Sequence, residues 1–177
     1  VMEGGPEFYE ITKAFHNALH GHSRPFQPRD FEIFLEYNQR PCRQLALDGR
    51  FVVIHDPQPA ALIESRAPAQ SDGQKWFWRC HIDLSHADLA VWRFLEPYVN
   101  RYDGAIFSSP EFSRQLAIPQ FLFYPSIDPL ADKNRDLDAA FIQSTLARFG
   151  IDPERRILTQ ISRFDRLKDP VGVLRAY

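Results

Sequence analysis

Four consecutive apolar residues, Phe51-Val52-Val53-Ile54, end abruptly in the polar, turn-forming sequence His55-Asp56-Pro57. A short continuous run of β-branched and aromatic residues between polar boundaries is typical of a buried parallel strand. Such a strand needs neighbouring strands, and the connections between parallel strands usually contain helices that cover the sheet. This run therefore predicts an α/β fold rather than a helical bundle or an antiparallel sandwich.

The same alternation continues along the chain. Further strands are predicted at residues 76–82, 104–107, 120–124 and 157–161, and each is followed by polar or proline-containing sequence. Apolar residues at helical spacing predict helices at 7–19, 28–38 and 137–149. A further helix is predicted to start in the capping-box-like sequence at Ser85 and Asp88, and another at Asp169-Pro170. Strands that alternate with helices at this spacing indicate a Rossmann-like parallel sheet with flanking helices.

A polar break at residues 152–156 separates the helix at 137–149 from the strand at 157–161. We place a domain boundary there, with one Rossmann-like domain at 1–152 and the start of a second at 153–177. The first residues are already patterned and the last lie inside a helical pattern, so both ends of the chain are interpreted as cuts.

Composition excludes several classes of protein. The formal net charge is −2 among 25% charged residues, whereas binding to nucleic acid or to an anionic membrane surface requires a basic face. No apolar run approaches the roughly 20 residues that span a bilayer, and no secretory signal is visible. Two cysteines, Cys42 and Cys80, are too few for a disulfide framework, which favours reduced thiols and a cytoplasmic location.

Polar residues at the strand ends are the candidates for chemistry, because ligands of parallel α/β sheets bind beyond the carboxyl ends of the strands. The strand-end candidates are His55, Asp56, His81, Ser108 and Ser126. A carboxylate such as Asp56 can accept hydrogen bonds from sugar hydroxyls, and an imidazole can donate or accept. The alternatives remain open, since Asp56 is as well suited to cap a turn and His81 to bond a main-chain carbonyl in the core.

A second candidate is the basic loop at residues 162–168, which leads into the helix opened by Asp169-Pro170. Arg163 offers a planar fork to phosphate oxygens and Lys168 a movable point charge, and a helix N-terminus adds unpaired N–H groups. A diphosphate would suit this arrangement. Solvated charges in loops are common, however. The loop taken alone therefore favours the simpler interpretation that its basic residues are surface charges without a ligand.

The sequence around these candidates resembles that of a known family. Residues 162–170 (SRFDRLKDP) are similar to the Arg-x4-Lys element of family 4 retaining glycosyltransferases. Four further segments look like those of the trehalose glycosyltransferring synthase group and occur in the same order: 15–19 (FHNAL), 55–63 (HDPQPAALI), 78–85 (WRCHIDLS) and 125–130 (PSIDPL). The resemblance extends over nearly the whole chain.

The resemblance implies a GT-B architecture, in which two Rossmann-like domains face each other across a cleft. It implies transfer of glucose from a nucleoside-diphosphate glucose to glucose, giving α,α-trehalose with retention. Arg163 and Lys168 would neutralise the leaving diphosphate, and His81 would approach the donor sugar. Asp56, with His55 beside it, would hold the acceptor. Neither a tightly bound cofactor nor a metal held by an Asp-x-Asp motif is implied.

Several expectations stay open at this stage. The family's opening strand with its Gly-rich loop and its Glu-x7-Glu element have no counterpart in residues 1–177, so the fragment alone is expected to be inactive. A retaining trehalose phosphorylase is a close alternative, and a non-catalytic sugar-binding module is an alternative of another class. The expected partners are small sugars and a nucleotide sugar, without nucleic acid or membrane, and the oligomeric state is undecided between monomer and homo-oligomer.

Overall fold

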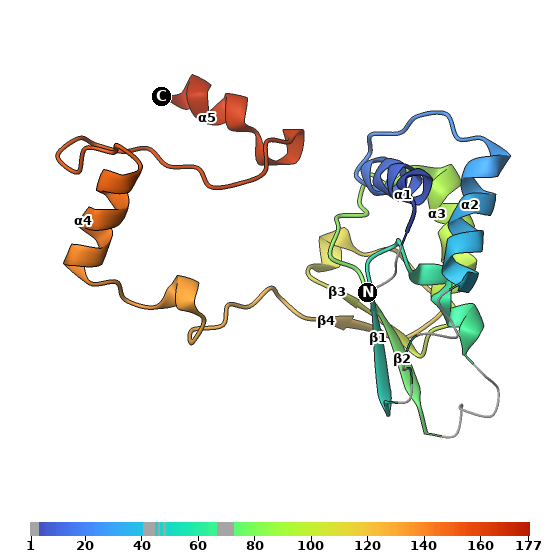
Figure 1. The fold of residues 1–177 in the computed structure, drawn as a ribbon. Helices are drawn as coiled ribbons and strands as arrows, with labels where there is room; N and C mark the ends of the chain where they lie inside the picture. Colours follow the sequence, from blue (N-terminus) through green and yellow to red (C-terminus); the bar gives the residue numbers. More distant parts are fainter. Residues whose placement is uncertain (1–3, 41–44, 46, 48, 67–72) are drawn as a thin grey trace. The chain divides into compact units, whose positions relative to one another are not determined.

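The computed structural model describes residues 4–40, 45, 47, 49–66 and 73–177 (Figure 1). The chain divides into two compact units, residues 1–126 and 127–177. The predicted domain limits of 1–152 and 153–177 stay a prediction, and the two units are described separately below.

The first unit contains a parallel sheet of strand order β1-β2-β3-β4. Strand β1 is Phe51–His55, β2 is Lys75–Arg79, β3 is Gly104–Phe107 and β4 is Gln120–Leu122. Each strand pairs with the next one in sequence, so the carboxyl ends of all four strands lie at the same edge. The predicted α/β fold with a Rossmann-like parallel sheet is confirmed, although β2 and β4 end earlier than the predicted 82 and 124.

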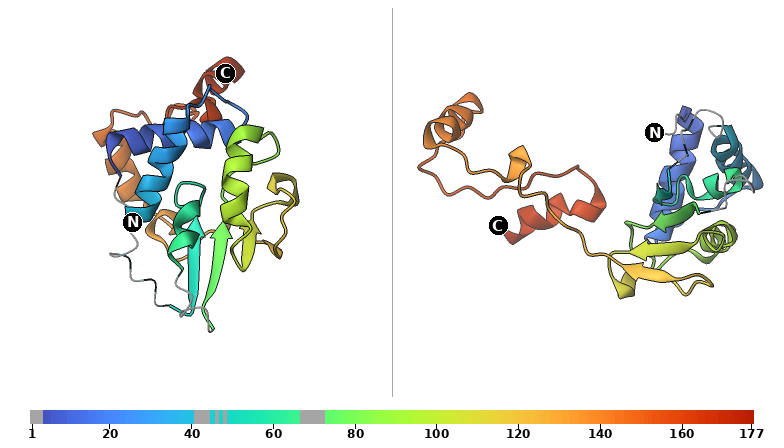
Figure 2. Two further views of the ribbon diagram at one scale, coloured as in Figure 1. Left: turned by 90° about the vertical axis from the view of Figure 1, so that its right-hand side faces the viewer. Right: turned by 90° about the horizontal axis from the view of Figure 1, so that it is seen from below.

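Three helices of the first unit pack together over one face of this sheet (Figure 2). Helix α1 is Pro6–Leu19, α2 is Pro28–Gln39 and α3 is Leu89–Val99, and the 3-10 helix η2, Ala60–Ser65, packs against α2, α3 and β1. Helix α1 ends where predicted, because Gly21 adopts a φ of +83° that side chains disfavour. Helix α3 begins four residues later than Ser85, since the carboxylate of Asp88 caps it.

The core lies between this sheet face and the helices. Its largest fully buried side chains come from α1, α2, β2 and β3: Trp76, Trp78, Phe15, Phe34 and Phe107. Aromatic rings meet edge to face within it, as between Trp78 and Phe107 at 6.0 Å. These buried aromatic residues therefore contribute to the packing of the core.

The described residues of this unit leave much of the opposite face of the sheet uncovered. Strand β1 alternates between exposed and buried residues, with Phe51 65% and Val53 43% exposed while Val52 and Ile54 are buried. The continuous apolar run predicted a fully buried strand, and that expectation is wrong for these residues. Parallel register places His55, Arg79 and Ile106 in one row across the same uncovered face.

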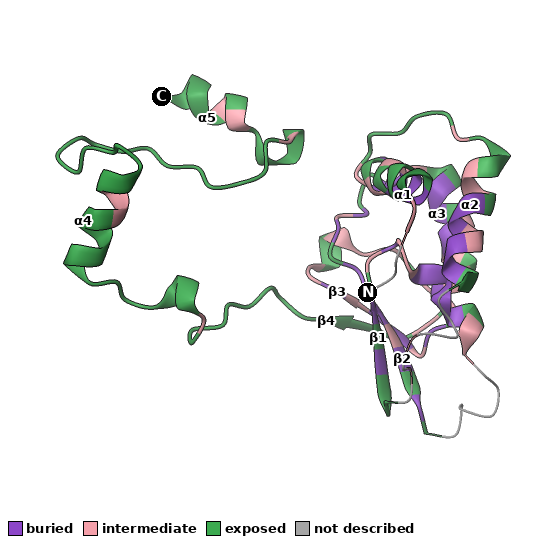
Figure 3. Ribbon diagram, viewed as in Figure 1, coloured by how far each residue is buried: buried purple, intermediate pink, exposed green. Residues whose placement is uncertain are grey.

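The second unit consists of short elements with mostly exposed side chains (Figure 3). Helix α4 is Ala139–Arg148 with Asp138 as its N-cap, η6 is Arg166–Lys168, and α5 is Pro170–Ala176 with Asp169 as its N-cap. The predicted strand at 157–161 is wrong here, because these residues have no regular secondary structure. A strand needs a hydrogen-bonded neighbour, and the described residues supply none for Ile157, Leu158 or Ile161, which are exposed.

Candidate functional site

The carboxyl ends of β1 and β2 bring three predicted site residues together. His55 is the last residue of β1 and Asp56 follows it, while His81 comes two residues after the end of β2. The pairing of His55 with Arg79 sets this arrangement, because it aligns the two strand ends.

The side chains of His55 and His81 are in direct contact. Nδ1 of His55 lies 2.8 Å from Nε2 of His81, and the rings are stacked with centroids 5.1 Å apart and planes 11° from parallel. A hydrogen bond between two imidazole nitrogens requires a proton on one and a lone pair on the other. The contact therefore couples the tautomers of the two rings, and each ring fixes the orientation of its neighbour.

Asp56 holds the main chain of this site in place. Its φ of +67° lies in the left-handed region, where Asp is tolerated better than most residues. Its Oδ1 accepts a hydrogen bond from the main-chain N–H of His81 at 3.1 Å, and its carbonyl oxygen accepts one from Nε1 of Trp78 at 2.9 Å. Asp56 thus links β1 to the loop that carries His81, and its predicted role in holding a sugar acceptor stays a prediction.

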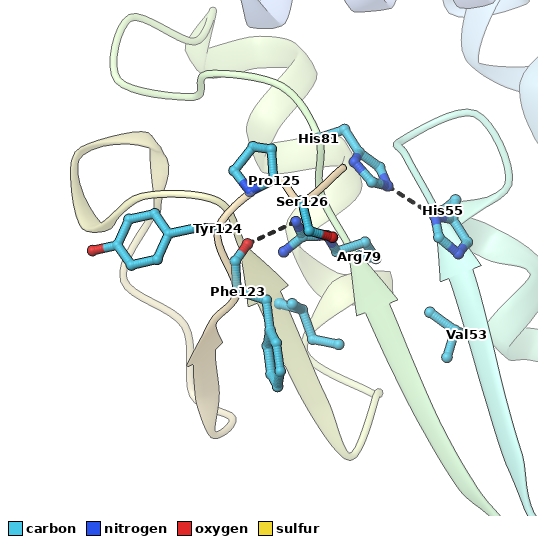
Figure 4. A pocket seen from close by; sticks show the side chains of 9 residues that line it. Val53, His55, Arg79, His81, Phe123, Tyr124, Pro125 and Ser126 are labelled. Carbon is cyan, nitrogen blue, oxygen red and sulfur yellow. Dashed lines mark hydrogen bonds between the residues drawn. The ribbon is translucent and has the colours of Figure 1, made fainter. Parts of the chain in front are cut away.

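A pocket of about 560 Å³ opens at these strand ends (Figure 4). The volume is within the usual range for small-molecule sites. The pocket is lined by residues of β1, β2 and β3, by His81 after β2, and by the segment after β4: Val53, His55, Arg79, His81, Ile106, Phe123, Tyr124, Pro125 and Ser126.

Arg79 is a site residue that the sequence pattern did not single out. It is only 9% exposed, and its Nη2 donates to Ser108 Oγ at 3.1 Å. The same Nη2 donates to the carbonyl of Phe123 at 2.9 Å (Figure 4). The sequence signal is a cation inside an otherwise apolar strand, two residues before the strand-end histidine His81. Such a charge indicates a group that can reach the same site.

Cys80 lies between Arg79 and His81 but faces the core. Burial raises the pKa of its thiol to about 12, so the reactive thiolate is disfavoured, and Sγ donates to the carbonyl of Ile82. This cysteine is structural. Cys42 lies outside the described residues.

Arg163 and Lys168 belong to the second unit. The Arg163 side chain is 79% exposed and its Nε lies 3.3 Å from Asp165 Oδ2, a surface pair of little energetic weight. Lys168 ends η6, and its carbonyl oxygen accepts a hydrogen bond from the side chain of Gln160. A smaller pocket of about 380 Å³ lies beside them, lined by Phe164, Asp165, Arg166, Asp169, Pro170 and Val171. The predicted diphosphate-binding role of both cations stays a prediction.

The chain does contain one Asp-x-Asp spacing, Asp136-Leu137-Asp138, which corrects the expectation that this motif is missing. The Oδ1 atom of Asp138 accepts hydrogen bonds from the N–H groups of Ala140 and Phe141, so it serves as a helix cap. Across the described part of the chain, no group of three or more His, Cys, Asp or Glu residues is placed to hold a metal ion. The described helices are also too short or too polar to cross a membrane.

The fold and the pocket define a class of protein: a Rossmann-like domain with a small-molecule site at the carboxyl ends of its parallel strands. A family model described as the N-terminal domain of trehalose synthase matches residues 1–114. The chain belongs to this family.

Individual relatives agree with this assignment. The chain is 41% identical to trehalose synthase of Thermococcus litoralis over 181 residues, and 41% identical to that of Pyrococcus horikoshii over 187 residues. It is 40% identical to trehalose synthase of Rubrobacter xylanophilus over 185 residues. These matches cover 100% of this chain but only 43–44% of each relative. The chain thus spans less than half the length of the curated relatives it matches.

Proposed function

We propose that the full-length protein is a retaining glucosyltransferase that makes α,α-trehalose from a nucleoside-diphosphate glucose and glucose. The observation that carries the proposal is the 40–41% identity, along the whole chain, to proteins named trehalose synthase. The strand-end pocket supports it, because His55, His81 and Ser126 offer hydrogen-bond donors and acceptors that can bind sugar hydroxyls. The proposal includes a GT-B architecture with a second Rossmann-like domain.

In this reaction the bond between the anomeric carbon and the diphosphate breaks, and negative charge develops on the departing phosphate oxygen. The proposed role of Arg163 and Lys168 is to neutralise that charge, an electrostatic stabilisation of the transition state. His81, held by His55 and by the carboxylate of Asp56, would contact the donor sugar.

The acceptor is proposed to lie beside Asp56 and His55. Its hydroxyl oxygen would attack the anomeric carbon from the face that the diphosphate leaves, and its proton would pass to the leaving phosphate. Attack and departure on one face give retention without a side-chain nucleophile. The buried Cys80 thiol is unsuited to that role in any case, since its pKa is raised to about 12.

The proposed co-substrate is the nucleotide sugar itself, with no tightly bound cofactor and no metal held by side chains, in a cytoplasmic enzyme. Addition of a chelator is therefore expected to leave the rate of transfer unchanged. The isolated 177-residue chain is expected to be inactive, because the relatives that carry the trehalose synthase name are more than twice as long.

The test incubates the full-length protein with glucose and a panel of nucleoside-diphosphate glucoses, and identifies the disaccharide and its anomeric configuration. The expected product is α,α-trehalose, formed without added phosphate, with the isolated chain as a control that forms none. Consumption of trehalose only in the presence of inorganic phosphate would instead identify a phosphorylase. Binding of sugars without any turnover would identify a non-catalytic module.

A further inference from the structure

Arg79 is a buried cation whose charge has no carboxylate partner among the residues that the structure describes. Its Nη1 atom is buried and has no hydrogen-bond partner among the described residues, whereas Nη2 is satisfied by Ser108 Oγ and the carbonyl of Phe123. Ion pairs between described residues involve other basic side chains and not Arg79. The Asp56 carboxylate at the same strand ends accepts a hydrogen bond from the N–H of His81.

Burial of the Arg79 guanidinium without an opposite charge destabilises the folded protein unless a ligand supplies that charge. Removing a guanidinium from water costs several kcal/mol, and only an opposite charge with good hydrogen-bond geometry offsets that cost. Arginine cannot lose its proton to escape the penalty. Neutral acceptors such as Ser108 Oγ and the Phe123 carbonyl satisfy hydrogen bonds, but they do not balance the charge.

The pocket is built to receive an anion beside this guanidinium. Arg79 forms part of its lining, together with the imidazoles of His55 and His81 and the hydroxyl-bearing Ser126 (Figure 4). These side chains can all donate hydrogen bonds, and the described lining contains no Asp or Glu. Guanidinium binds phosphate through parallel N–H···O bonds, and Nη1 is the donor that remains for such a contact.

We propose that Arg79 forms a phosphate-binding subsite in the strand-end pocket, distinct from the basic loop that holds Arg163 and Lys168. The ligand is a phosphate group, carried by a sugar phosphate or a nucleoside diphosphate, or free as inorganic phosphate. The identity of its sugar carrier rests on the proposed function, whereas the binding of phosphate does not. Through Ser108, Arg79 is hydrogen-bonded to the residue that follows β3, and through Phe123 to the segment after β4, so the same guanidinium contacts two segments at the strand ends.

The experiment measures binding of inorganic phosphate, glucose 6-phosphate and uridine diphosphate to the full-length protein by calorimetry, at fixed ionic strength. Arg79→Gln removes the charge, and Arg79→Lys keeps it without the planar fork. The matched control is Arg114→Gln, because Arg114 is also partly buried and donates to a main-chain carbonyl, that of Ala87, but lies outside the pocket. Thermal unfolding establishes which variants are folded.

We expect at least one phosphate probe to bind roughly tenfold or more weakly to Arg79→Gln than to the wild type, because the variant loses a hydrogen bond from a charged donor. Arg79→Lys is expected to lie in between, and Arg114→Gln to match the wild type. Dependence on Arg79 for glucose 6-phosphate alone identifies a sugar phosphate as the source, and dependence for uridine diphosphate alone identifies the nucleotide. Equal affinities of the folded Arg79→Gln protein and the wild type for every probe overturn the proposal.

A second measurement keeps the test valid if Arg79→Gln does not fold. Phosphate is titrated into the wild-type protein while the imidazole resonances of His55 and His81, which line the same pocket, are followed by NMR. Glucose 6-phosphate and uridine diphosphate are titrated in the same way. Saturable shifts with at least one of the three probes support the subsite, and their absence with all three overturns it. Neither measurement involves glucosyl transfer, so a protein that binds phosphate through Arg79 but makes no trehalose refutes only the proposed function.

Discussion

Replacement of Asp103 by Asn is expected to destabilise the sheet that carries the site. Asp103 precedes β3, and its Oδ2 accepts a hydrogen bond from the main-chain N–H of Trp76 at 2.8 Å and lies 3.0 Å from Nη1 of Arg66. Its Oδ1 accepts from Nζ of Lys75 at 3.1 Å. The carboxylate is 21% exposed and therefore connects three groups in a partly desolvated position.

The magnitude follows from these contacts. A hydrogen bond to a charged group contributes about 1.5–3 kcal/mol, whereas an exposed pair such as the one with Lys75 contributes less than about 1 kcal/mol. Asn can still accept one hydrogen bond but loses the charge. The Asp103→Asn variant is therefore expected to lose about 2 kcal/mol of unfolding free energy at neutral pH.

The effect should depend on pH in a defined direction. Burial alone would raise the pKa of Asp103, but the hydrogen bonds from Trp76 and Lys75 and the charge of Arg66 together hold it below its ordinary value. A carboxyl group with a lowered folded pKa contributes stability that is present above its unfolded pKa, about 3.9, and is lost as the pH falls through the folded pKa. The difference in unfolding free energy between the wild type and Asp103→Asn should therefore disappear as the pH falls into the acid range.

Urea unfolding followed by tryptophan fluorescence measures this difference. The chain has three tryptophans, at positions 76, 78 and 92, and all belong to the first unit, so the signal reports on that unit. Glu32→Gln is the control, because the ion pair that Glu32 forms with Arg29 is exposed on both sides. A difference below about 0.5 kcal/mol, or one that stays constant from neutral to acid pH, would refute the reasoning.

Three further predictions concern single side chains. In a Cys42→Ser background, Cys80 should resist alkylation in the folded protein and react fully in urea, because burial raises its pKa to about 12; rapid labelling of the folded protein would contradict this. Asp88→Ala should lower the unfolding free energy by about 1 kcal/mol in the same urea assay, since its Oδ1 accepts from the N–H groups of residues 90 and 91 at the start of α3. Arg163→Ala and Lys168→Ala should each reduce kcat/KM for trehalose formation by about 10²-fold or more in the full-length protein, and near-normal rates would remove them from the diphosphate site.

Local patterns predicted much of the sheet and its edge. The apolar runs at β1 and β3 and their polar ends led to a parallel sheet, and from there to His55, Asp56 and His81 as candidates. The contact between His55 and His81 could not be predicted, because it depends on β1 and β2 being neighbours in a particular register. Arg79 was missed for the same reason: its partners Ser108 and Phe123 are 29 and 44 residues away in sequence.

The wrong predictions have a common physical origin. An apolar run such as residues 157–161 has the composition of a strand, yet a strand forms only where a neighbour supplies hydrogen bonds, and no described residue does so. The run at β1 is buried on one face only, since the described helices cover one face of the sheet. Helix starts, unlike strands, depend on adjacent residues and can be predicted from local sequence. Asp169 and Pro170 accordingly open α5 as predicted.

The most direct test of the account is the comparison of His81→Ala with His86→Ala in the full-length protein. Both histidines are exposed and lie five residues apart, but His81 contacts His55 in the strand-end pocket, whereas His86 is not part of its lining. The measurement is kcat/KM for trehalose formation from glucose and the preferred nucleotide sugar. We expect a loss of about 10²-fold or more for His81→Ala with an unchanged melting temperature, and wild-type rates for His86→Ala. Equal rates for the two variants would contradict the assignment of this pocket as the site of glucosyl transfer.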